Sequence, residues 1–255
     1  MCTVTLYRST DRLLVTMNRD ERRNRSEELP PRRAGGQGEA RWIGPADGET
    51  GGTWFGANDR GMVACLLNAY APGDLELVSS GDAPSRGWII PELLVRTPEK
   101  ATHWLTSDLD PTVFPSFTLL LATIQSVDVY SWRLDTGVAR TTLEDGWTMV
   151  TSSWWRAADV VRWRRERFAK WCDDGARMEH GVPAFNLLEV VDRREWSPMM
   201  TRSFSITRSL SQAELAPGRP DVHVRYWRRD DEHPIEPVRP TAAATLRLAD
   251  SQTHS

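Results

Sequence analysis

The hydrophobic and polar positions at the start of the chain alternate in the manner of a β-hairpin. Residues 3–7 repeat with a period of two, residues 9–12 are turn formers, and residues 13–17 form a short apolar run. A turn centred within residues 9–12 sets Cys2 opposite Arg19. Cross-strand neighbours lie roughly 4.5–5.5 Å apart at Cβ and diagonal ones roughly 7–8 Å. The hairpin therefore carries Cys2 back beside Arg19 and its neighbours.

A second alternating stretch predicts another hairpin, with strands at residues 53–55 and 62–67 around Asn58-Asp59-Arg60-Gly61. Centring the turn in the middle of this sequence sets Asn68 opposite Gly51. A glycine opposite a polar residue at a strand end leaves room for a ligand to approach the backbone. Asn68 is therefore a candidate oxyanion donor, through its backbone N–H or its amide. The alternative is an ordinary asparagine at the start of a loop.

The remaining pattern predicts further strands and helices. Strands are expected at residues 117–124, 127–132, 140–142, 147–151, 203–209 and 221–227. Helices are expected at residues 85–96, with a break at Pro91, at 154–172 and at 183–191, and a further helix is expected to start at residue 97. The clearest helix, 154–172, has an apolar stripe formed by Ala157, Val160, Val161, Phe168, Trp171 and Cys172.

Two segments lack this periodicity. Residues 22–52 are dense in Arg, Glu, Pro and Gly and are predicted to be an exposed loop. Its arginines could bind an anionic substrate, or they could be neutralised by nearby Asp and Glu. Residues 236–255 are rich in Pro, Ala and Thr and are predicted to be a flexible tail. The elements before the tail indicate one domain over residues 1–235, with antiparallel sheets packed on each other and flanked by helices.

Composition narrows the classes of function. The chain has 255 residues and a formal net charge of −3 with 26% charged residues, so its charge calls for neither nucleic acid nor a membrane surface. No apolar run approaches the roughly 18 residues of a membrane span, and the N-terminus lacks a secretory signal. We therefore expect a cytoplasmic protein without a membrane span, and the sequence leaves a homo-oligomer open.

The three cysteines differ in their chemical context. Cys2, Cys65 and Cys172 show neither Cys-x-x-Cys spacing nor an even count, which argues against a disulfide framework or a zinc site. We expect no metal and no cofactor. Cys65 and Cys172 lie in apolar stretches and are most simply core residues. Cys2 alone has a chemical context.

Removal of Met1 would leave a thiol and a free α-amine on Cys2. A thiol with a pKa of about 8.5 and an amine of about 7.7–8.0 would then share a site with Asp20, whose carboxylate can orient the amine together with Asn18. An amine near neutrality can take the proton of the thiol. Taken singly, a cysteine at position 2 is usually inert and Asn-Arg-Asp-Glu a solvated strand end. Together and in register they indicate a nucleophile.

Several motifs in order resemble those of the NRDE family, also called the transport and Golgi organisation protein 2 family. They are Met1-Cys2, Asn18-Arg19-Asp20-Glu21, Gly51-Gly52-Thr53-Trp54-Phe55-Gly56, Asn58-Asp59-Arg60-Gly61 leading to Leu66-Leu67-Asn68, Ser85-Arg86-Gly87 and, more weakly, Thr201-Arg202-Ser203. The family is similar in outline to bile-salt hydrolases and penicillin V acylases. The resemblance implies an α+β fold, the four-layer αββα sandwich of N-terminal nucleophile hydrolases. It also implies hydrolysis of a linear amide bond in a small-molecule amide or acyl substrate, through an acyl-enzyme on Cys2.

The resemblance also implies roles for two residues later in the chain. In the acylases an Asn that ends a similar strand stabilises the oxyanion, which matches Asn68. They also place an Arg near the catalytic cysteine late in the chain, which matches Arg202. Strand alternation puts Arg202 on the face of Phe204 and Ile206, where it would need a partner such as Asp20. An exposed arginine on an edge strand is the alternative.

The chain departs from the acylase pattern at two places. Met17 stands where the acylases have an Arg, for which Arg19 could compensate. Ser152 or Ser153 stands where an Asn amide donor is expected, and losing one such donor typically costs about 10²–10³ in turnover. Besides these catalytic candidates, we expect four residues to contact the substrate: Glu21, Trp54, Ser152 and Ser153.

Two other classes of function stay open at this stage. Eukaryotic members of the family are associated with lipid and haem handling, so a non-catalytic lipid- or haem-binding protein on the same scaffold is the main alternative. Haem would be the cofactor only in that case, and Cys2, His103 and His180 do not lie at ligand spacing. A redox-sensing thiol is the third hypothesis.

Overall fold

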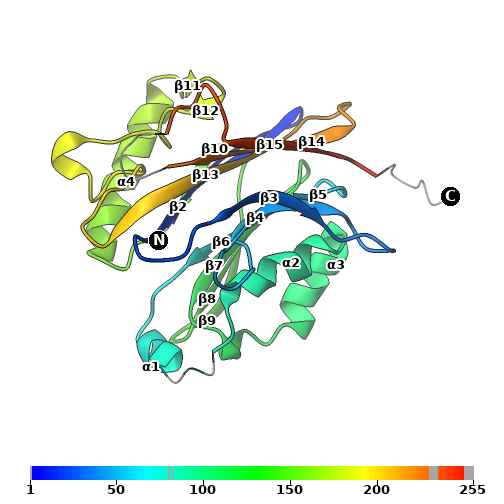
Figure 1. The fold of residues 1–255 in the computed structure, drawn as a ribbon, viewed down its shortest axis with the longest axis horizontal. Helices are drawn as coiled ribbons and strands as arrows, with labels where there is room; N and C mark the ends of the chain where they lie inside the picture. Colours follow the sequence, from blue (N-terminus) through cyan, green and yellow to red (C-terminus); the bar gives the residue numbers. More distant parts are fainter. Residues whose placement is uncertain (1, 80, 82, 230–234, 250–255) are drawn as a thin grey trace.

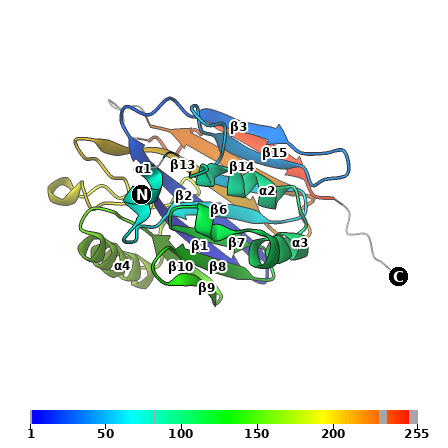
Figure 2. The same cartoon turned by 90° about the horizontal axis from the view of Figure 1, so that it is seen from below.

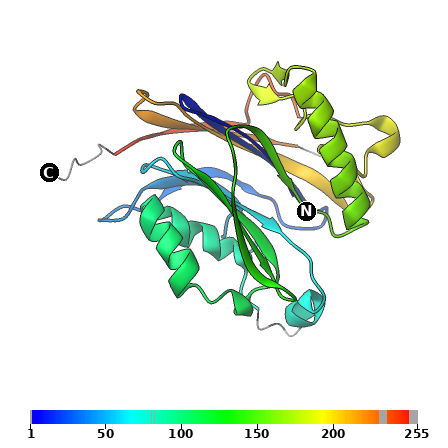
Figure 3. The same ribbon diagram turned by 180° about the vertical axis from the view of Figure 1, so that it is seen from behind.

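Two antiparallel sheets lie face to face, with helices on their outer faces (Figure 1). The computed structural model describes residues 2–79, 81, 83–229 and 235–249. Helix α4 (Ala157–Asp173) covers the outer face of one sheet, as Figure 3 shows from behind. Helices α2 (Ile89–Leu94) and α3 (Pro98–His103) cover the other, where α2 packs on two neighbouring strands (Figure 2). The α+β four-layer sandwich is confirmed.

The first sheet has six strands in the order β10-β1-β2-β13-β14-β15. They are β1 (Cys2–Ser9), β2 (Arg12–Arg22), β10 (Gly146–Thr151), β13 (Ser205–Leu215), β14 (Asp221–Arg228) and β15 (Ala242–Arg247). Strand β15 lies within residues 236–255, so the prediction of a flexible tail is wrong for this part. It pairs with β14 and buries Leu246 in the core, which the Ala- and Thr-rich sequence did not reveal. Residues 250–255 lie outside the described residues.

The second sheet has seven strands in sequence order. They are β3 (Leu29–Ala34), β4 (Trp42–Ala46), β5 (Phe55–Asn58), β6 (Val63–Asn68), β7 (Phe117–Ala122), β8 (Val127–Arg133) and β9 (Gly137–Thr142). The exposed loop predicted at residues 22–52 therefore contains two strands. The pairing of β3 with β4 is interrupted between Leu29 and Arg32, so Pro30 and Pro31, which lack an N–H, lie where the ladder is broken. Strands β9 and β10 belong to different sheets.

The first hairpin has the predicted register, with Cys2 paired to Arg19 and Thr3 to Asn18. The second is shifted by one residue, because Phe55 pairs with Cys65. Its turn is centred on Arg60, since Asn58 Oδ1 accepts the backbone N–H groups of Arg60 and Met62 and Gly61 has a left-handed conformation.

The pairing of β5 with β6 does not extend to Asn68. Its pairs run from Phe55–Cys65 to Ala57–Val63, so the predicted pairing of Asn68 with Gly51 is not formed, and Asn68 pairs on its other edge with Phe117 of β7. Asn68 still reaches the end of its strand, where the two sheets splay apart.

The prediction of a helix at residues 183–191 is wrong. It begins with strand β12 (Val182–Pro183), which pairs with β11 (Met178–Glu179), and continues in turns. The reason lies at Asn186, which is fully buried. Its backbone carbonyl accepts the Asn18 amide at 2.9 Å, and its side chain accepts the Thr5 hydroxyl at 2.6 Å, so a helical hydrogen bond is replaced.

The remaining helices are short. They are α1 (Asp74–Ser79), η1 (Arg86–Trp88), η2 (Trp104–Asp108), η3 (Pro111–Val113) and η4 (Val191–Arg193). Among the described residues, none of the helices has the length and apolar character that crossing a bilayer requires.

Candidate active site

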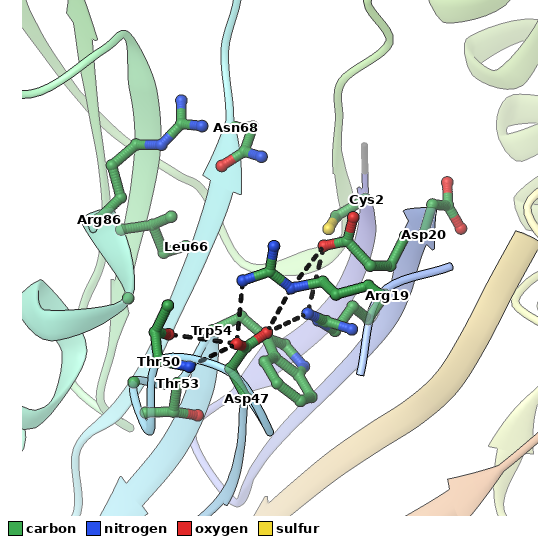
Figure 4. Close-up of a pocket in the computed structure, with 14 residues that line it drawn as sticks. Cys2, Arg19, Asp20, Asp47, Thr50, Thr53, Trp54, Leu66, Asn68 and Arg86 are labelled. Atoms are coloured by element: carbon green, nitrogen blue, oxygen red, sulfur yellow. Dashed lines mark hydrogen bonds and ion pairs between the residues drawn. The ribbon is translucent and has the colours of Figure 1, made fainter. Parts of the chain in front are cut away.

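A pocket of about 160 Å³ opens between the two sheets, where β1 starts and β2 and β6 end (Figure 4). An engineered apolar cavity of roughly 150 Å³ holds benzene, so the enclosed part accepts a group of that size. Six of the residues predicted for the site line it, namely Cys2, Arg19, Asp20, Glu21, Trp54 and Asn68. Asn18, Ser152, Ser153 and Arg202 do not.

Cys2 is the first residue of β1, and its side chain is 7% exposed. It lies on the same face as its cross-strand neighbour Arg19 and borders the core between the sheets. Burial raises the pKa of the Cys2 thiol, and the Asp20 carboxylate adds to this. The charge of Arg19 and a hydrogen bond from the Asp20 backbone N–H lower the pKa without offsetting burial. The thiol is therefore protonated at neutral pH, and a nucleophile here needs a base.

Arg19 is held by carboxylates on several sides. Its guanidinium lies over the Trp54 ring at 4.1 Å from the ring centroid. It pairs with Glu28, with Asp47 at 2.8 Å and with Glu21 at 3.2 Å. Glu28 also accepts the hydroxyl of Tyr226 at 2.8 Å. Arg19 is thus a fixed part of the pocket wall whose charge is already balanced.

Asp47 is a pocket residue that sequence reasoning missed. Its carboxylate accepts two hydrogen bonds from Arg25, Nε to Oδ2 at 2.7 Å and Nη2 to Oδ1 at 2.9 Å, and one from the Thr50 N–H at 3.0 Å. Burial opposes its ionisation, but these hydrogen bonds and the charges of Arg25 and Arg19 hold the pKa of Asp47 well below its usual range. The arginines of residues 22–52 were expected either to bind an anionic substrate or to be neutralised by nearby acids. For Arg25 the second alternative applies, because nearby acids neutralise its charge.

Asp20 points to the opposite face of β2 from Arg19, because successive side chains of a strand alternate. Figure 4 shows its carboxylate directed away from the Cys2 sulfur. Oδ1 accepts the Thr207 hydroxyl at 2.6 Å, and Oδ2 lies 3.7 Å from Nη2 of Arg164. Burial raises the pKa of Asp20, while Arg164 and Thr207 act against it. The carboxylate is thus fixed from the helix side of the sheet.

Arg164 of α4 is the second residue that the sequence missed, and it is fully buried. Nη1 donates to the hydroxyls of Thr3 at 2.8 Å and Thr151 at 2.9 Å, which joins β1 to β10. Nε and Nη2 donate to the carbonyls of Trp196 and Ser197. The helical pattern held a signal, because Arg164 lies four residues from Val160 and from Phe168, on the stripe predicted to be apolar.

Two predicted catalytic residues have other roles. Asn18 is fully buried on the helix side of the sheet, where its amide donates to the carbonyls of Asn186 and Pro198. Its expected role of orienting the amine is therefore corrected to anchoring that segment. Arg202 is buried but donates twice to the Glu195 carbonyl, at 2.9 and 2.7 Å, and lies over Trp155.

Arg202 is buried, as predicted, but it does not share a face with Phe204. Phe204 is 45% exposed, whereas Arg202 and Ile206 are buried. Strand β13 starts only at Ser205, so strand alternation does not extend back to Arg202. Arg164 lies 3.7 Å from Asp20, and the charge of Arg202 also acts on the Asp20 carboxylate.

The two serines lie next to Cys2 without lining the pocket. The backbone N–H of Ser152 donates to the Cys2 carbonyl at 3.0 Å and so extends the pairing of β10 with β1. Ser153 Oγ donates to the Trp155 carbonyl at 2.7 Å. The hydroxyl of Ser152 is buried and makes no hydrogen bond with the described residues.

The glycine motifs hold one wall of the pocket together. The Thr53 N–H donates to the Gly87 carbonyl at 2.9 Å, and Ser85 Oγ accepts the Gly87 N–H at 3.3 Å. A Cβ on Gly52 would lie 2.8 Å from the Gly87 carbonyl, where two backbones meet. The motifs Gly51-Gly52-Thr53 and Ser85-Arg86-Gly87 are therefore two halves of one contact.

This contact predicts an asymmetry between its two glycines. Gly52→Ala should lower the free energy of unfolding by about 1–3 kcal/mol, because neither backbone can move aside. Gly87→Ala should have a smaller effect, since its Cβ would meet its neighbours at 3.4 Å. Urea denaturation of both variants measures this difference. Equal destabilisation would contradict it.

The described residues contain no group of three His, Cys, Asp or Glu side chains arranged to hold a metal ion.

Comparisons with known proteins agree with this architecture. The N-acylethanolamine-hydrolyzing acid amidase ortholog of Caenorhabditis elegans superposes with a TM-score of 0.58 and 15% identity, over 86% of this chain and 94% of that one. The C2A mutant of conjugated bile acid hydrolase from Clostridium perfringens gives 0.49 and 11% identity, over 97% and 92%. These neighbours have the fold of N-terminal nucleophile hydrolases. No curated protein matches the chain in sequence. Residues 1–225 match the family described as Transport and Golgi organisation 2, and the chain belongs to that family.

Proposed function

We propose that the protein is an N-terminal cysteine amidohydrolase that cleaves a linear amide bond through an acyl-enzyme on Cys2. The observation that carries the proposal is the position of Cys2. Its thiol lines a pocket that also contains Asn68, and its backbone lies opposite Arg19, one residue from Asp20. The first hairpin sets Cys2 beside the end of β2, where the Asp20 carboxylate lies on the other face of the sheet, and β6 of the facing sheet contributes Asn68 to the pocket.

Removal of Met1 gives Cys2 a free α-amine, which supplies the base. Because burial keeps the thiol protonated, the amine takes its proton as sulfur attacks the carbonyl carbon of the amide. The tetrahedral intermediate collapses, the C–N bond breaks, and the ammonium returns the proton to the departing amine. Water, deprotonated by the same amine, then attacks the thioester carbonyl. The C–S bond breaks, the acid leaves, and the ammonium returns its proton to the Cys2 sulfur.

Two groups assist these steps. The amide of Asn68 makes no side-chain hydrogen bond with the described residues, so its N–H groups are free to donate to the oxyanion. Asp20 stabilises the protonated amine and is itself held by Thr207 and Arg164. Arg164 thus acts as a positioning residue.

The likeness to a Caenorhabditis elegans protein named for hydrolysing N-acylethanolamines supports the reaction class, because that bond is a linear amide. The likeness rests on the fold, and the substrate of this chain is argued from its own residues below.

Mass spectrometry tests the proposal directly. Intact-mass analysis should show a protein that lacks Met1. After rapid quenching with N-acyl amides of varied head group and chain length, the peptide that begins at Cys2 should carry the acyl group. Cys2→Ala serves as the control without adduct. Retention of Met1, or no adduct with any amide, would refute the hydrolase.

A further inference from the structure

One arginine of the pocket, Arg86, has Asp74 and Glu21 in its surroundings but no acid within ion-pair distance among the described residues. Arg86 donates from Nη1 to the Ser116 carbonyl at 2.7 Å and forms no ion pair with the described residues. Arg19 and Arg25, on the same pocket, each contact at least three carboxylates. A guanidinium has five N–H groups, so most of those of Arg86 remain for a ligand.

The position of this guanidinium is fixed next to the proposed oxyanion donor. The Ser116 carbonyl that accepts Nη1 of Arg86 also accepts the Ala69 N–H at 3.1 Å. The guanidinium is therefore held beside the peptide that follows Asn68. Figure 4 shows Arg86 and Asn68 on one side of the pocket, apart from the ion pairs around Asp47.

The backbone that carries Arg86 is also fixed. Gly87 accepts the Thr53 N–H and donates to Ser85 Oγ, so the turn is fastened to the strand segment next to Trp54. A cation held in place before binding loses little freedom when a ligand arrives, which favours specific recognition.

We propose that Arg86 binds the carboxylate of the substrate, and that the substrate is an N-acyl amino acid whose amino-acid part fills the enclosed pocket. This inference rests on the proposed function and names its substrate class. Burying a charge without a partner is costly, and a carboxylate provides the bidentate partner that a guanidinium fits.

Size and charge narrow the ligand further. A space of about 160 Å³ accepts a small amino acid, while a long acyl chain has to extend out of the pocket. A dianionic phosphate is disfavoured, because Arg19 and Arg25 are already paired with acids, which leaves Arg86 to balance both negative charges. A singly charged carboxylate needs only Arg86.

Binding to the Cys2→Ala variant tests the inference without turnover. Calorimetry should show that N-hexanoylglycine binds at least about tenfold more tightly than N-hexanoylethanolamine, which has the same chain and lacks the charge. Adding Arg86→Gln should abolish this preference. Arg133→Gln is the matched control, because Arg133 also donates to a backbone carbonyl, at 3.1 Å, but lies outside the pocket.

Other results of these binding experiments would contradict a specific part of the proposal. Equal affinity for the two ligands, or an equal loss for both in Arg86→Gln, would overturn the carboxylate site. Tighter binding of N-hexanoyl-aminomethylphosphonate or of a succinyl hexylamide would overturn the amino-acid assignment. Binding that depends on Arg86, combined with no acyl adduct on wild-type Cys2, would support the carboxylate site and refute the hydrolase instead.

Discussion

Replacing Cys2 with alanine should lower kcat/KM for an N-acyl amide by at least about 10³-fold, because no other group can form the thioester. The fold should persist, since alanine fills most of the space of a cysteine and Met1 is still removed before it. The measurement is steady-state kinetics, with circular dichroism to confirm folding.

Cys65→Ala provides the matched control. Cys65 is a fully buried thiol in β6, and it belongs to the same apolar core as Cys2. Its burial raises the pKa of the thiol well above its ordinary value, so it is a poor nucleophile. Its loss should affect stability and leave turnover within a few-fold. A large loss of activity in Cys65→Ala, or full activity in Cys2→Ala, would contradict the mechanism.

Replacing Asp47 with asparagine should lower the free energy of unfolding by about 3 kcal/mol at pH 7, because it leaves the charges of Arg19 and Arg25 short of a buried partner. Both arginines contact Asp47 within 2.9 Å, and its side chain is largely buried. Urea denaturation measures the effect. A change below about 1 kcal/mol would show that the network contributes little.

The effect of Asp47 should depend on pH in one direction. Its pKa in the folded protein is depressed, whereas the unfolded chain has a value of about 3.9. Its stabilisation is therefore fully present above that value and is lost as the pH falls towards the folded pKa. The difference between wild type and Asp47→Asn should accordingly shrink between pH 6 and pH 3.

Asp159→Asn is the matched control for Asp47. Asp159 also pairs with two arginines, Arg156 and Arg162, but all three lie on the exposed side of α4. Exposed pairs typically contribute about 0–1 kcal/mol. An effect of Asp159→Asn as large as that of Asp47→Asn would mean that burial does not determine the contribution.

Local patterns predicted the first hairpin and the position of Cys2, because strand alternation and a short turn fix the register. They failed where the cause lies far along the chain. Residues 183–191 form turns because Asn18, more than 160 residues earlier, occupies the carbonyl of Asn186. Strand β15 forms because β14 offers it an edge.

For the candidate site too, local sequence patterns predicted some residues and not others. Cys2, Asp20 and Asn68 were found because each lies at the end of a strand whose pattern is clear. Asp47 lies in a segment without periodicity and Arg86 at the start of a predicted helix, and only the packing of the two sheets brings them to the thiol. Arg164 lies on the apolar stripe of α4 and its partner Asp20 is distant in sequence, so only the packing of α4 on the sheet brings the two together.

The pairing of β1 on both of its edges has a practical consequence. Thr3 pairs with Asn18 of β2 and with Thr151 of β10, so the strand cannot slide to make room for residues added in front of it. A purification tag ahead of Cys2 would both acylate the amine and crowd the cavity. Recombinant protein for any assay should therefore carry its tag at the C-terminus.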